Sequence, residues 1–287
     1  MSELFLPPLN IRSLLHQYGL HPSKGLGQNF LQDTDVLQNI VKYAAIQSTD
    51  NILEIGPGLG NLTRYLALSA RSVTAVELDR NLFPALEDVL GSYNNIHLVQ
   101  GDILQLDPAV LMGGLEYIVV ANIPYYITSA VIRHLLETEP PPQRVILTVQ
   151  KEVAERICAK TGEMNIMALS VQVYGEPSIS EIIPASAFYP QPNVDSAVLR
   201  IEIQPQPILS PAYLDTFFVL IKAGFSQKRK TLRNSLSGGL HLAPNESEKL
   251  LTAAGVDPRR RAETLSLEEW SRLCEHHVAN RDKLTYS

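Results

Sequence analysis

Short apolar runs alternate with Gly- or Asp-rich turns and with segments of helical period along most of the chain. The runs have the length of buried strands, and the helical segments between them each present one apolar face. Such alternation is typical of a parallel α/β sheet covered by helices. The predicted strands are residues 51–55, 72–77, 96–100, 117–121 and 144–149.

The pattern changes after Pro177. Two extended runs, 179–183 and 197–203, follow each other without a helix between them. They predict an antiparallel hairpin that completes a mixed, mostly parallel sheet. A short amphipathic segment at 11–18 precedes the first strand, so the expected architecture is α/β with an N-terminal helical segment.

Proline is dense in the segment QPQPILSP, residues 204–211. Because proline lacks a backbone donor and has a fixed φ, neither a helix nor a central strand continues through this segment. The residues after it have helical spacing, interrupted by glycines and prolines, and no strand alternation. We therefore expect two domains: an α/β domain at 1–204 and a small all-α domain at 205–287.

The net charge of −6 is unevenly distributed along the chain. Residues 1–204 carry 12 Lys and Arg against 21 Asp and Glu, whereas residues 205–287 carry 12 against 9. Within the second part the cations are bunched at 228–233 and at 259–261. Because Lys and Arg neutralise nucleic-acid phosphates, this bunching indicates an RNA-facing surface. The alternative is an ordinary solvated helix face.

Several classes of protein are disfavoured by what the sequence lacks. It has no apolar run long enough to cross a bilayer, and its start, MSELFLPPLN, lacks the basic and apolar regions of a signal peptide. Cys158 and Cys274 have no CxxC partner, and the seven histidines have no metal-ligand spacing. We expect a cytoplasmic protein with reduced cysteines, no bound metal and no membrane association.

A glycine-rich turn, LEIGPGLGNLT at 53–63, follows the first predicted strand. Gly56 and Gly58 let the backbone approach a ligand that a Cβ atom would exclude. Glu77 ends the next strand, a position from which a carboxylate accepts hydrogen bonds from ribose hydroxyls. Asp102 follows the third strand and is placed to bind the amino group of an adenine. Together these turns predict an adenosine pocket.

A glycine-rich turn of this kind also occurs in dinucleotide-binding proteins. The third glycine is Gly60, where the dinucleotide fingerprint requires position 61, and Pro57 removes an amide that could face a pyrophosphate. No Gly-Lys-Ser/Thr follows the glycines, which excludes a P-loop. The turn favours a methyl donor that carries adenosine, with NAD as the alternative.

The segment VANIPYY, 120–126, ends the fourth predicted strand, at the edge where open α/β sheets bind ligands. The lone pair of adenine N6 is delocalised into the ring, so methylation at N6 needs acceptors that localise it. The amide oxygen of Asn122 and the carbonyl of Ile123 would accept the two N6 hydrogens. Pro124 would stiffen the turn, and Tyr125 would stack on the base. The alternative is a plain loop between a strand and a helix.

A further aromatic residue, Phe188, stands in the proline-constrained segment AFYPQPNVDSAV. It is a candidate for contact with the other side of a splayed-out base. A single phenylalanine is more often a core residue, and this interpretation stays open beside the functional one.

Eight segments of the chain carry a specific pattern when they are taken together: KGLGQNFL (24–31), LEIGPGLGNLT (53–63), VELD (76–79), GD (101–102), NIPYY (122–126), QKEVAERI (150–157), FYPQPNVDSAV (188–198) and GFSQKRKTLRNSL (224–236). Together they resemble the ribosomal RNA adenine dimethyltransferases, and among them the bacterial small-subunit group. Large-subunit resistance methyltransferases share QNF and NIPY, whereas PNVDSAV and the last segment favour the small-subunit group.

The resemblance implies a Rossmann-like class I S-adenosylmethionine-dependent methyltransferase fold, with a mixed, mostly parallel seven-stranded sheet and a small all-α C-terminal domain. It implies dimethylation of two adjacent adenosines in the 3′-terminal hairpin loop of 16S rRNA, within the 30S subunit or its late precursor, by a monomer. S-adenosylmethionine would be the donor and S-adenosylhomocysteine the product. Two hypotheses from other functional classes remain beside it: the protein is a nicotinamide dehydrogenase, or it is a noncatalytic RNA-binding assembly factor.

The resemblance also assigns residues to roles. Tyr125 and Phe188 would hold the target base, with Asn122 serving the target amino group. The residues that would contact the rRNA backbone are Lys228, Arg229, Lys230 and Arg233. The residues that would line the S-adenosylmethionine site are Gln28, Asn29, Leu31, Gly56, Gly58, Glu77, Asp102, Ile103 and Asn122.

Overall fold

The computed structural model describes residues 6–204 and 208–285, with side chains to residue 279. Residues 205–207, inside the proline-rich segment predicted as a boundary, lie outside the described residues. So do residues 286–287 and residues 1–5, which begin the stretch that we compared with a signal peptide. The contacts divide the chain into two compact units, 1–154 with 177–203 and 155–176 with 204–287.

This division differs from a single boundary at residue 204. Residues 155–176 group with the C-terminal helices because Met164, Ala168 and Leu169 belong to the same apolar cluster as Phe217 and Trp270. The sequence has no proline-rich linker at either end of 155–176, so it does not indicate that these residues belong with the C-terminal helices.

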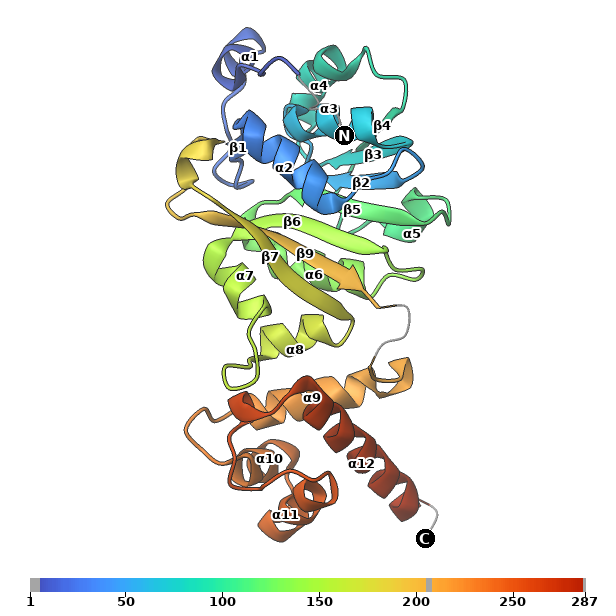
Figure 1. The fold of residues 1–287 in the computed structure, drawn as a ribbon, viewed down its shortest axis with the longest axis vertical. Helices are drawn as coiled ribbons and strands as arrows, with labels where there is room; N and C mark the ends of the chain where they lie inside the picture. The colour runs from blue at the N-terminus through green and yellow to red at the C-terminus, as the bar shows by residue number, and fades with distance from the viewer. Residues whose placement is uncertain (1–5, 205–207, 286–287) are drawn as a thin grey trace. The chain divides into compact units, whose positions relative to one another are not determined.

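A seven-stranded sheet with the order β4-β3-β2-β5-β6-β9-β7 forms the centre of the first unit (Figure 1). The strands from β4 to β6 pair in parallel, and β9 pairs antiparallel with β6. The predicted mixed, mostly parallel sheet is thus confirmed. The strands are β2 (Asn51–Ile55), β3 (Ser72–Glu77), β4 (Ile96–Gln100), β5 (Tyr117–Asn122), β6 (Arg144–Gln150), β7 (Gly175–Ile183) and β9 (Ser196–Ile203).

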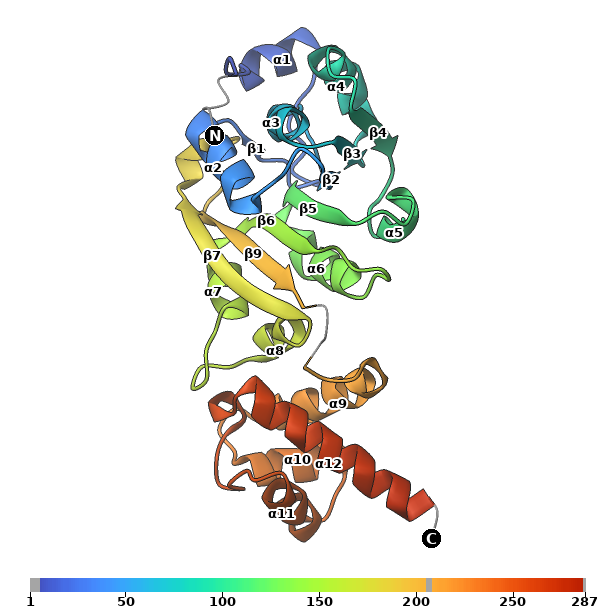
Figure 2. The same cartoon turned by 45° about the vertical axis from the view of Figure 1, so that its right-hand side comes forward.

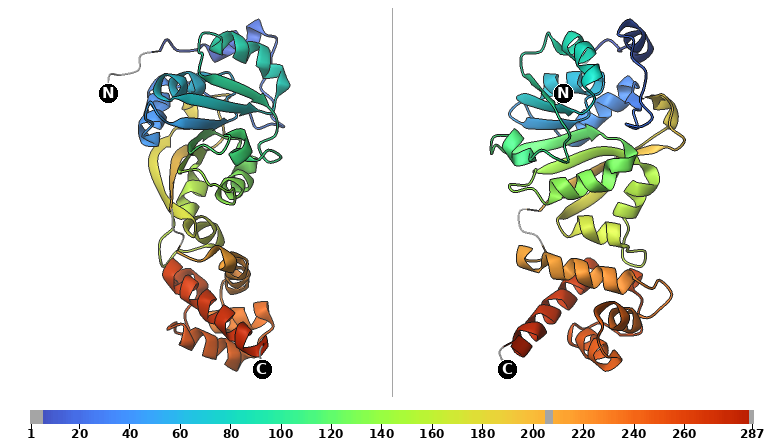
Figure 3. Two further views of the ribbon diagram at one scale, coloured as in Figure 1. Left: turned by 90° about the vertical axis from the view of Figure 1, so that its right-hand side faces the viewer. Right: turned by 180° about the vertical axis from the view of Figure 1, so that it is seen from behind.

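Helices cover both faces of this sheet. Figure 2 and the left panel of Figure 3 show the blue helix α2 on one face and the green helix α6 on the other. Strand β2 is buried at every position, as expected for a parallel strand covered on both sides. The helices of this part are α1 (Ile11–Gln17), α2 (Thr34–Ala44), α3 (Asn61–Ser69), η1 (Arg80–Leu82), α4 (Phe83–Leu90), α5 (Pro108–Leu111), η2 (Tyr125–Ile127), α6 (Thr128–Leu136) and η3 (Ala185–Ala187). Helix α7 (Lys151–Ile157) begins in this unit and ends in the second one.

A second, two-stranded sheet joins the N-terminal segment to a distant loop. Strand β1 (Phe30–Leu31) pairs antiparallel with β8 (Phe188–Tyr189), and Gln32 N donates to Ala187 O at 2.9 Å. Helix α1 packs in one apolar cluster with α4 and Phe30. These contacts hold the segment that precedes α2 beside the glycine-rich turn.

The second unit is helical and has its own core. Trp270 is fully buried there and stacks on Phe225, with 5.8 Å between the ring centroids. Among the described residues, no helix combines the length and the apolar character needed to cross a membrane. The helices are α8 (Ile166–Gln172), η4 (Pro211–Tyr213), α9 (Leu214–Phe225), α10 (Leu232–Leu240), α11 (Pro244–Ala253), η5 (Ala262–Thr264) and α12 (Leu267–Thr285).

Candidate active site and RNA-facing surface

A cleft of about 800 Å³, counted out to its open mouth, lies at the carboxyl ends of strands β2, β3, β4 and β5. Ligands of open α/β sheets bind at this edge. The cleft brings together residues predicted from five separate motifs. They are Gln28, Asn29, Gly56, Gly58, Glu77, Asp102, Ile103, Asn122, Ile123, Pro124 and Tyr125.

The glycine-rich turn adopts the left-handed conformation that favours glycine. Gly56 has φ +69°, and a Cβ atom there would have only the Asn122 carbonyl oxygen nearby, at 3.9 Å. Gly58 has φ +62°, but a Cβ atom there would lie 3.0 Å from the ring of Phe30. Gly56 therefore keeps space open in the cleft, whereas Gly58 also makes room for the protein's own N-terminal strand.

Glu77 ends β3 with its carboxylate folded toward the turn. It accepts hydrogen bonds from Gly58 N at 3.1 Å and from Asp79 N at 2.8 Å. Burial raises the pKa of Glu77, and these backbone donors oppose the rise. Asp102 Oδ1 accepts from Leu104 N at 3.0 Å. Because each carboxylate oxygen has two lone pairs, both side chains keep capacity for a ligand's hydroxyl or amino groups.

Asn122 is the last residue of β5 and is held by the N-terminal segment. Its Nδ2 donates to the backbone oxygen of Asn29 at 3.0 Å. With the nitrogen of the amide engaged in this way, Oδ1 is the atom left to accept a hydrogen bond from a ligand. The next residue, Ile123, is buried and also lines the cleft.

Two tyrosines of the NIPYY segment line the cleft in different ways. Tyr125 is half-buried, and its hydroxyl lies 2.7 Å from Ser196 Oγ. Tyr126 is 63% exposed, and a Cβ atom at Gly27 would lie 3.3 Å from its ring. Sequence analysis singled out only the first tyrosine. The second lies in the same motif, so its place at the cleft could have been anticipated.

Three predicted site residues have surroundings that the sequence did not suggest. Phe188 is 2% exposed and packs in the main core, so its ring does not reach the cleft in this structure. Leu31 pairs with it and lies outside the cleft, with its backbone oxygen accepting from Asn61 Nδ2 at 2.6 Å. Gln28 lines the cleft, but its amide bridges Ser23 N and Asp79 Oδ2, both at 2.8 Å.

Sequence analysis missed Glu54, a carboxyl on β2 that is 1% exposed. Among the described residues its Oε2 has no hydrogen-bond partner. Burial raises its pKa to about 8, the Glu77 carboxylate adds to the rise, and the nearby Thr63 hydroxyl opposes it. An acidic residue inside an apolar strand is a visible signal, but its burial depends on the helices that cover the sheet.

Glu54→Gln should change how stability depends on pH. Between its ordinary pKa of 4.5 and about 8, the folded protein holds a proton on Glu54 that the unfolded chain releases. The wild-type free energy of unfolding should therefore fall, relative to the variant, by about 1.4 kcal/mol for each pH unit in this window. Denaturant unfolding from pH 5 to 9 measures this difference. The exposed Glu87→Gln serves as the control, and a pH-independent difference for Glu54→Gln would contradict the prediction.

The basic residues at 228–230 are exposed in the loop between α9 and α10. Arg233, the fourth residue predicted to contact RNA, forms an ion pair with Glu248 at 3.0 Å. The backbone ties this loop to the second basic run, because Leu232 N donates to Arg260 O at 2.7 Å and Arg233 N donates to Pro258 O at 3.2 Å. Two basic runs that are distant in sequence thus lie side by side.

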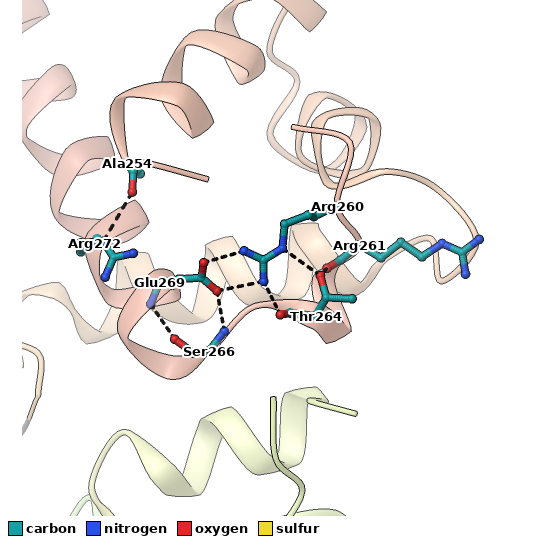
Figure 4. A network of polar contacts seen from close by, with 7 residues as sticks. All are labelled: Ala254, Arg260, Arg261, Thr264, Ser266, Glu269 and Arg272. Atoms are coloured by element: carbon teal, nitrogen blue, oxygen red, sulfur yellow. Dashed lines mark hydrogen bonds and ion pairs between the residues drawn. The ribbon is translucent and has the colours of Figure 1, made fainter. Parts of the chain in front are cut away.

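The three arginines of the second run have different surroundings (Figure 4). Arg260 is engaged inside the protein, where it forms an ion pair with Glu269 and donates to Thr264. Arg259 pairs with Asp257 at 3.0 Å. In Figure 4 the side chain of Arg261 points away from the Arg260 network, and its nearest carboxylate, Glu263, is 3.9 Å away. Arg260 therefore holds the loop that presents Arg261.

Comparison with known sequences places these features in a family. The sequence profile described as "Ribosomal RNA adenine dimethylase" matches residues 21–277. A "Ribosomal RNA small subunit methyltransferase A" from Dehalococcoides mccartyi strain CBDB1 is 46% identical over 270 residues, which cover 94% of this chain and 93% of the relative. A protein of the same name from Bacillus cereus strain B4264 is 40% identical over 284 residues, which cover 96% and 97%.

Two solved structures share the fold over most of the chain. The crystal structure of the 23S rRNA methyltransferase ErmE has a TM-score of 0.72 and 30% identity, and the match covers 86% of this chain and 99% of that one. That of a dimethyladenosine transferase from Plasmodium falciparum has a TM-score of 0.73 and 25% identity, with coverage of 85% and 95%. Since the profile spans most of the sequence and the relatives match it along nearly their whole length, this chain belongs to the ribosomal RNA adenine dimethylase family.

Proposed function

We propose that this protein transfers methyl groups from S-adenosylmethionine to N6 of two adjacent adenosines in the 3′-terminal hairpin loop of 16S rRNA. The observation that carries the proposal is the orientation of Asn122. Its Nδ2 is engaged by the Asn29 carbonyl at 3.0 Å, which leaves Oδ1 as an acceptor beside the cleft. An acceptor fixed at this place is what methylation of an adenine amino group requires.

The residues that line the cleft have the chemistry needed to bind the methyl donor. Carboxylates at Glu77 and Asp102 suit ribose hydroxyls and an adenine amino group, and the left-handed Gly56 leaves space beside them. Bound there, S-adenosylmethionine supplies an electrophilic methyl group. Gln28 supports this site indirectly, since its bond to Asp79 ties the N-terminal segment to the end of β3.

The target adenine would be held by residues of the NIPYY turn. We assign acceptor roles in the first transfer to Asn122 Oδ1 and to the carbonyl of Ile123. Each would accept a hydrogen bond from one N6 hydrogen, so that the nitrogen lone pair is localised on N6. The N6–methyl bond would then form as the bond between methyl and sulfur breaks, and S-adenosylhomocysteine would leave. Tyr125 would stack on the base, a contact that contributes about 1–3 kcal/mol. As positive charge develops on N6, the two oxygens stabilise it, and the extra proton then leaves to solvent. We assign Phe188 no contact with the target base because its ring is buried.

The similarity to known proteins favours the small ribosomal subunit over the large one as the substrate. Proteins named for the small subunit are 40–46% identical over nearly the whole chain, whereas the 23S rRNA methyltransferase is 30% identical. The exposed cations at 228–230 and the neighbouring Arg261 supply the charge to bind rRNA backbone in the 30S subunit or its late precursor. We place the protein in the cytoplasm, acting as a monomer and without a metal.

The proposal is tested with purified protein, labelled S-adenosylmethionine and undermethylated 30S particles. Nuclease digestion and mass spectrometry should find dimethyladenosine at two adjacent positions near the 3′ end of 16S rRNA. Binding of the particles without methyl transfer would instead support a noncatalytic assembly factor. Affinity for NADH and none for S-adenosylhomocysteine would support the dinucleotide alternative.

A further inference from the structure

The segment PNVDSAV, residues 192–198, has no role in the site described so far. Its serine, Ser196, is the first residue of β9 and is completely buried. Its Oγ lies 2.7 Å from the hydroxyl of Tyr125, 71 residues away in the sequence. The segment thus reaches the cleft through one side-chain contact.

Ser196 is held rigidly on its own side of this contact. It pairs with Gln150 in the antiparallel register of β6 and β9. The preceding residue, Asp195, is fixed twice, because its backbone oxygen accepts from Lys151 N and its Oδ1 accepts from Ala185 N, both at 3.0 Å. A buried strand end with this many bonds is a firm anchor for a hydroxyl.

Tyr125 is held less firmly at its own backbone. It begins a single 3-10 turn, η2, that follows Pro124, and none of the residues of this turn is buried. A tyrosine ring fixed only at its Cα can tilt, and a tilted face no longer matches the plane of a stacked base. The bond at the far end of the ring removes that freedom.

We propose that Ser196 is a positioning residue that fixes the plane of the Tyr125 ring, so that the target adenine stacks with N6 at the acceptors of the NIPYY turn. This inference rests on the proposed function, because it assigns Ser196 its effect through the base that Tyr125 holds. Ser196 itself touches neither the base nor the donor. The loss of its hydroxyl should therefore slow methyl transfer and leave donor binding unchanged.

The test is a double-mutant cycle with Ser196→Ala, Tyr125→Phe and the double variant. Each change removes one end of the same hydrogen bond and keeps the aromatic ring. Single-turnover methylation of undermethylated 30S particles is measured at saturating donor, with the protein in saturating excess over the particles. We expect each single variant to be about 3- to 10-fold slower than wild type, and the double variant to be no slower than the single ones. The dissociation constant for S-adenosylhomocysteine should stay at the wild-type value.

The control is Ser72→Ala on strand β3. Ser72 Oγ donates to Asn51 Oδ1 at 2.9 Å, so this variant also removes a side-chain hydrogen bond from the same sheet, at the end of the strands away from the cleft. Its single-turnover rate should equal that of wild type even where its melting temperature falls. A slower rate for Ser196→Ala but not for Ser72→Ala would therefore come from the position of the Tyr125 ring and not from a general loss of stability.

Two results would overturn the inference. One is a Ser196→Ala rate equal to that of wild type, and the other is a double variant whose defect is the product of the two single defects. Both require an active wild-type protein. If wild type forms no dimethyladenosine, the proposed function fails instead, so the two failures are distinguishable.

Discussion

Asn122→Ala should lower kcat by about 10²-fold or more, with little loss of donor binding. The reason is that Oδ1 would stabilise charge that develops on N6 only during the transfer, and one preorganised group of this kind contributes about 2.7–4 kcal/mol. Under the proposed assignment, the donor's adenosine would be held mainly by Glu77 and Asp102, which line the cleft and which the substitution leaves in place. Steady-state methylation of 30S particles measures kcat, and calorimetric titration with S-adenosylhomocysteine measures the binding.

A matched control for this variant is Asn51→Ala. Asn51 also lies on a strand of the sheet, and its Nδ2 donates to the Glu116 carbonyl at 3.1 Å, a bond close in length to that between Asn122 and Asn29. It stands at the amino end of β2, away from the cleft, so its loss should affect stability and leave kcat unchanged. An Asn122→Ala enzyme with wild-type turnover would remove this side chain from the mechanism.

Replacing Lys228, Arg229 and Lys230 together by Gln should weaken rRNA binding and flatten its dependence on salt. Each lost phosphate contact makes the negative slope of log affinity against log salt shallower by about 0.7–0.9, so the loss of three contacts makes it shallower by about 2–3. These side chains are exposed in a loop, and the fold should tolerate their neutralisation. Filter binding of 30S particles over a series of salt concentrations gives the slope for each protein.

The control for this variant removes the same charge elsewhere. Lys42, Arg71 and Lys249 are exposed and lie outside the cleft and both basic runs, and replacing them by Gln should leave the slope close to that of wild type. A slope that does not change in the 228–230 variant would show that this loop is ordinary surface. Arg261→Gln alone should lower the slope by less than about 1, as a single contact would.

The sequence by itself determined the sheet and most of the site, because both depend on local patterns. The first three predicted strands have the observed bounds, and the fourth and fifth end one residue later, at Asn122 and Gln150. In a parallel sheet every strand brings its carboxyl end to one edge. Residues at the ends of different strands or just after them, such as Glu77, Asp102 and Asn122, therefore meet at one cleft.

Only the tertiary structure decided which distant segments touch. The pairing of β1 with β8 buries Phe188, which the sequence offered as a base-stacking residue, and it brings Asn29 to Asn122. The contact between Ser196 and Tyr125 also joins segments that are distant in sequence. So does the grouping of residues 155–176 with the C-terminal helices. Apolar periodicity reports whether a position faces a core, but it carries no information about which remote residue lies opposite. That partner is fixed only when the whole chain packs.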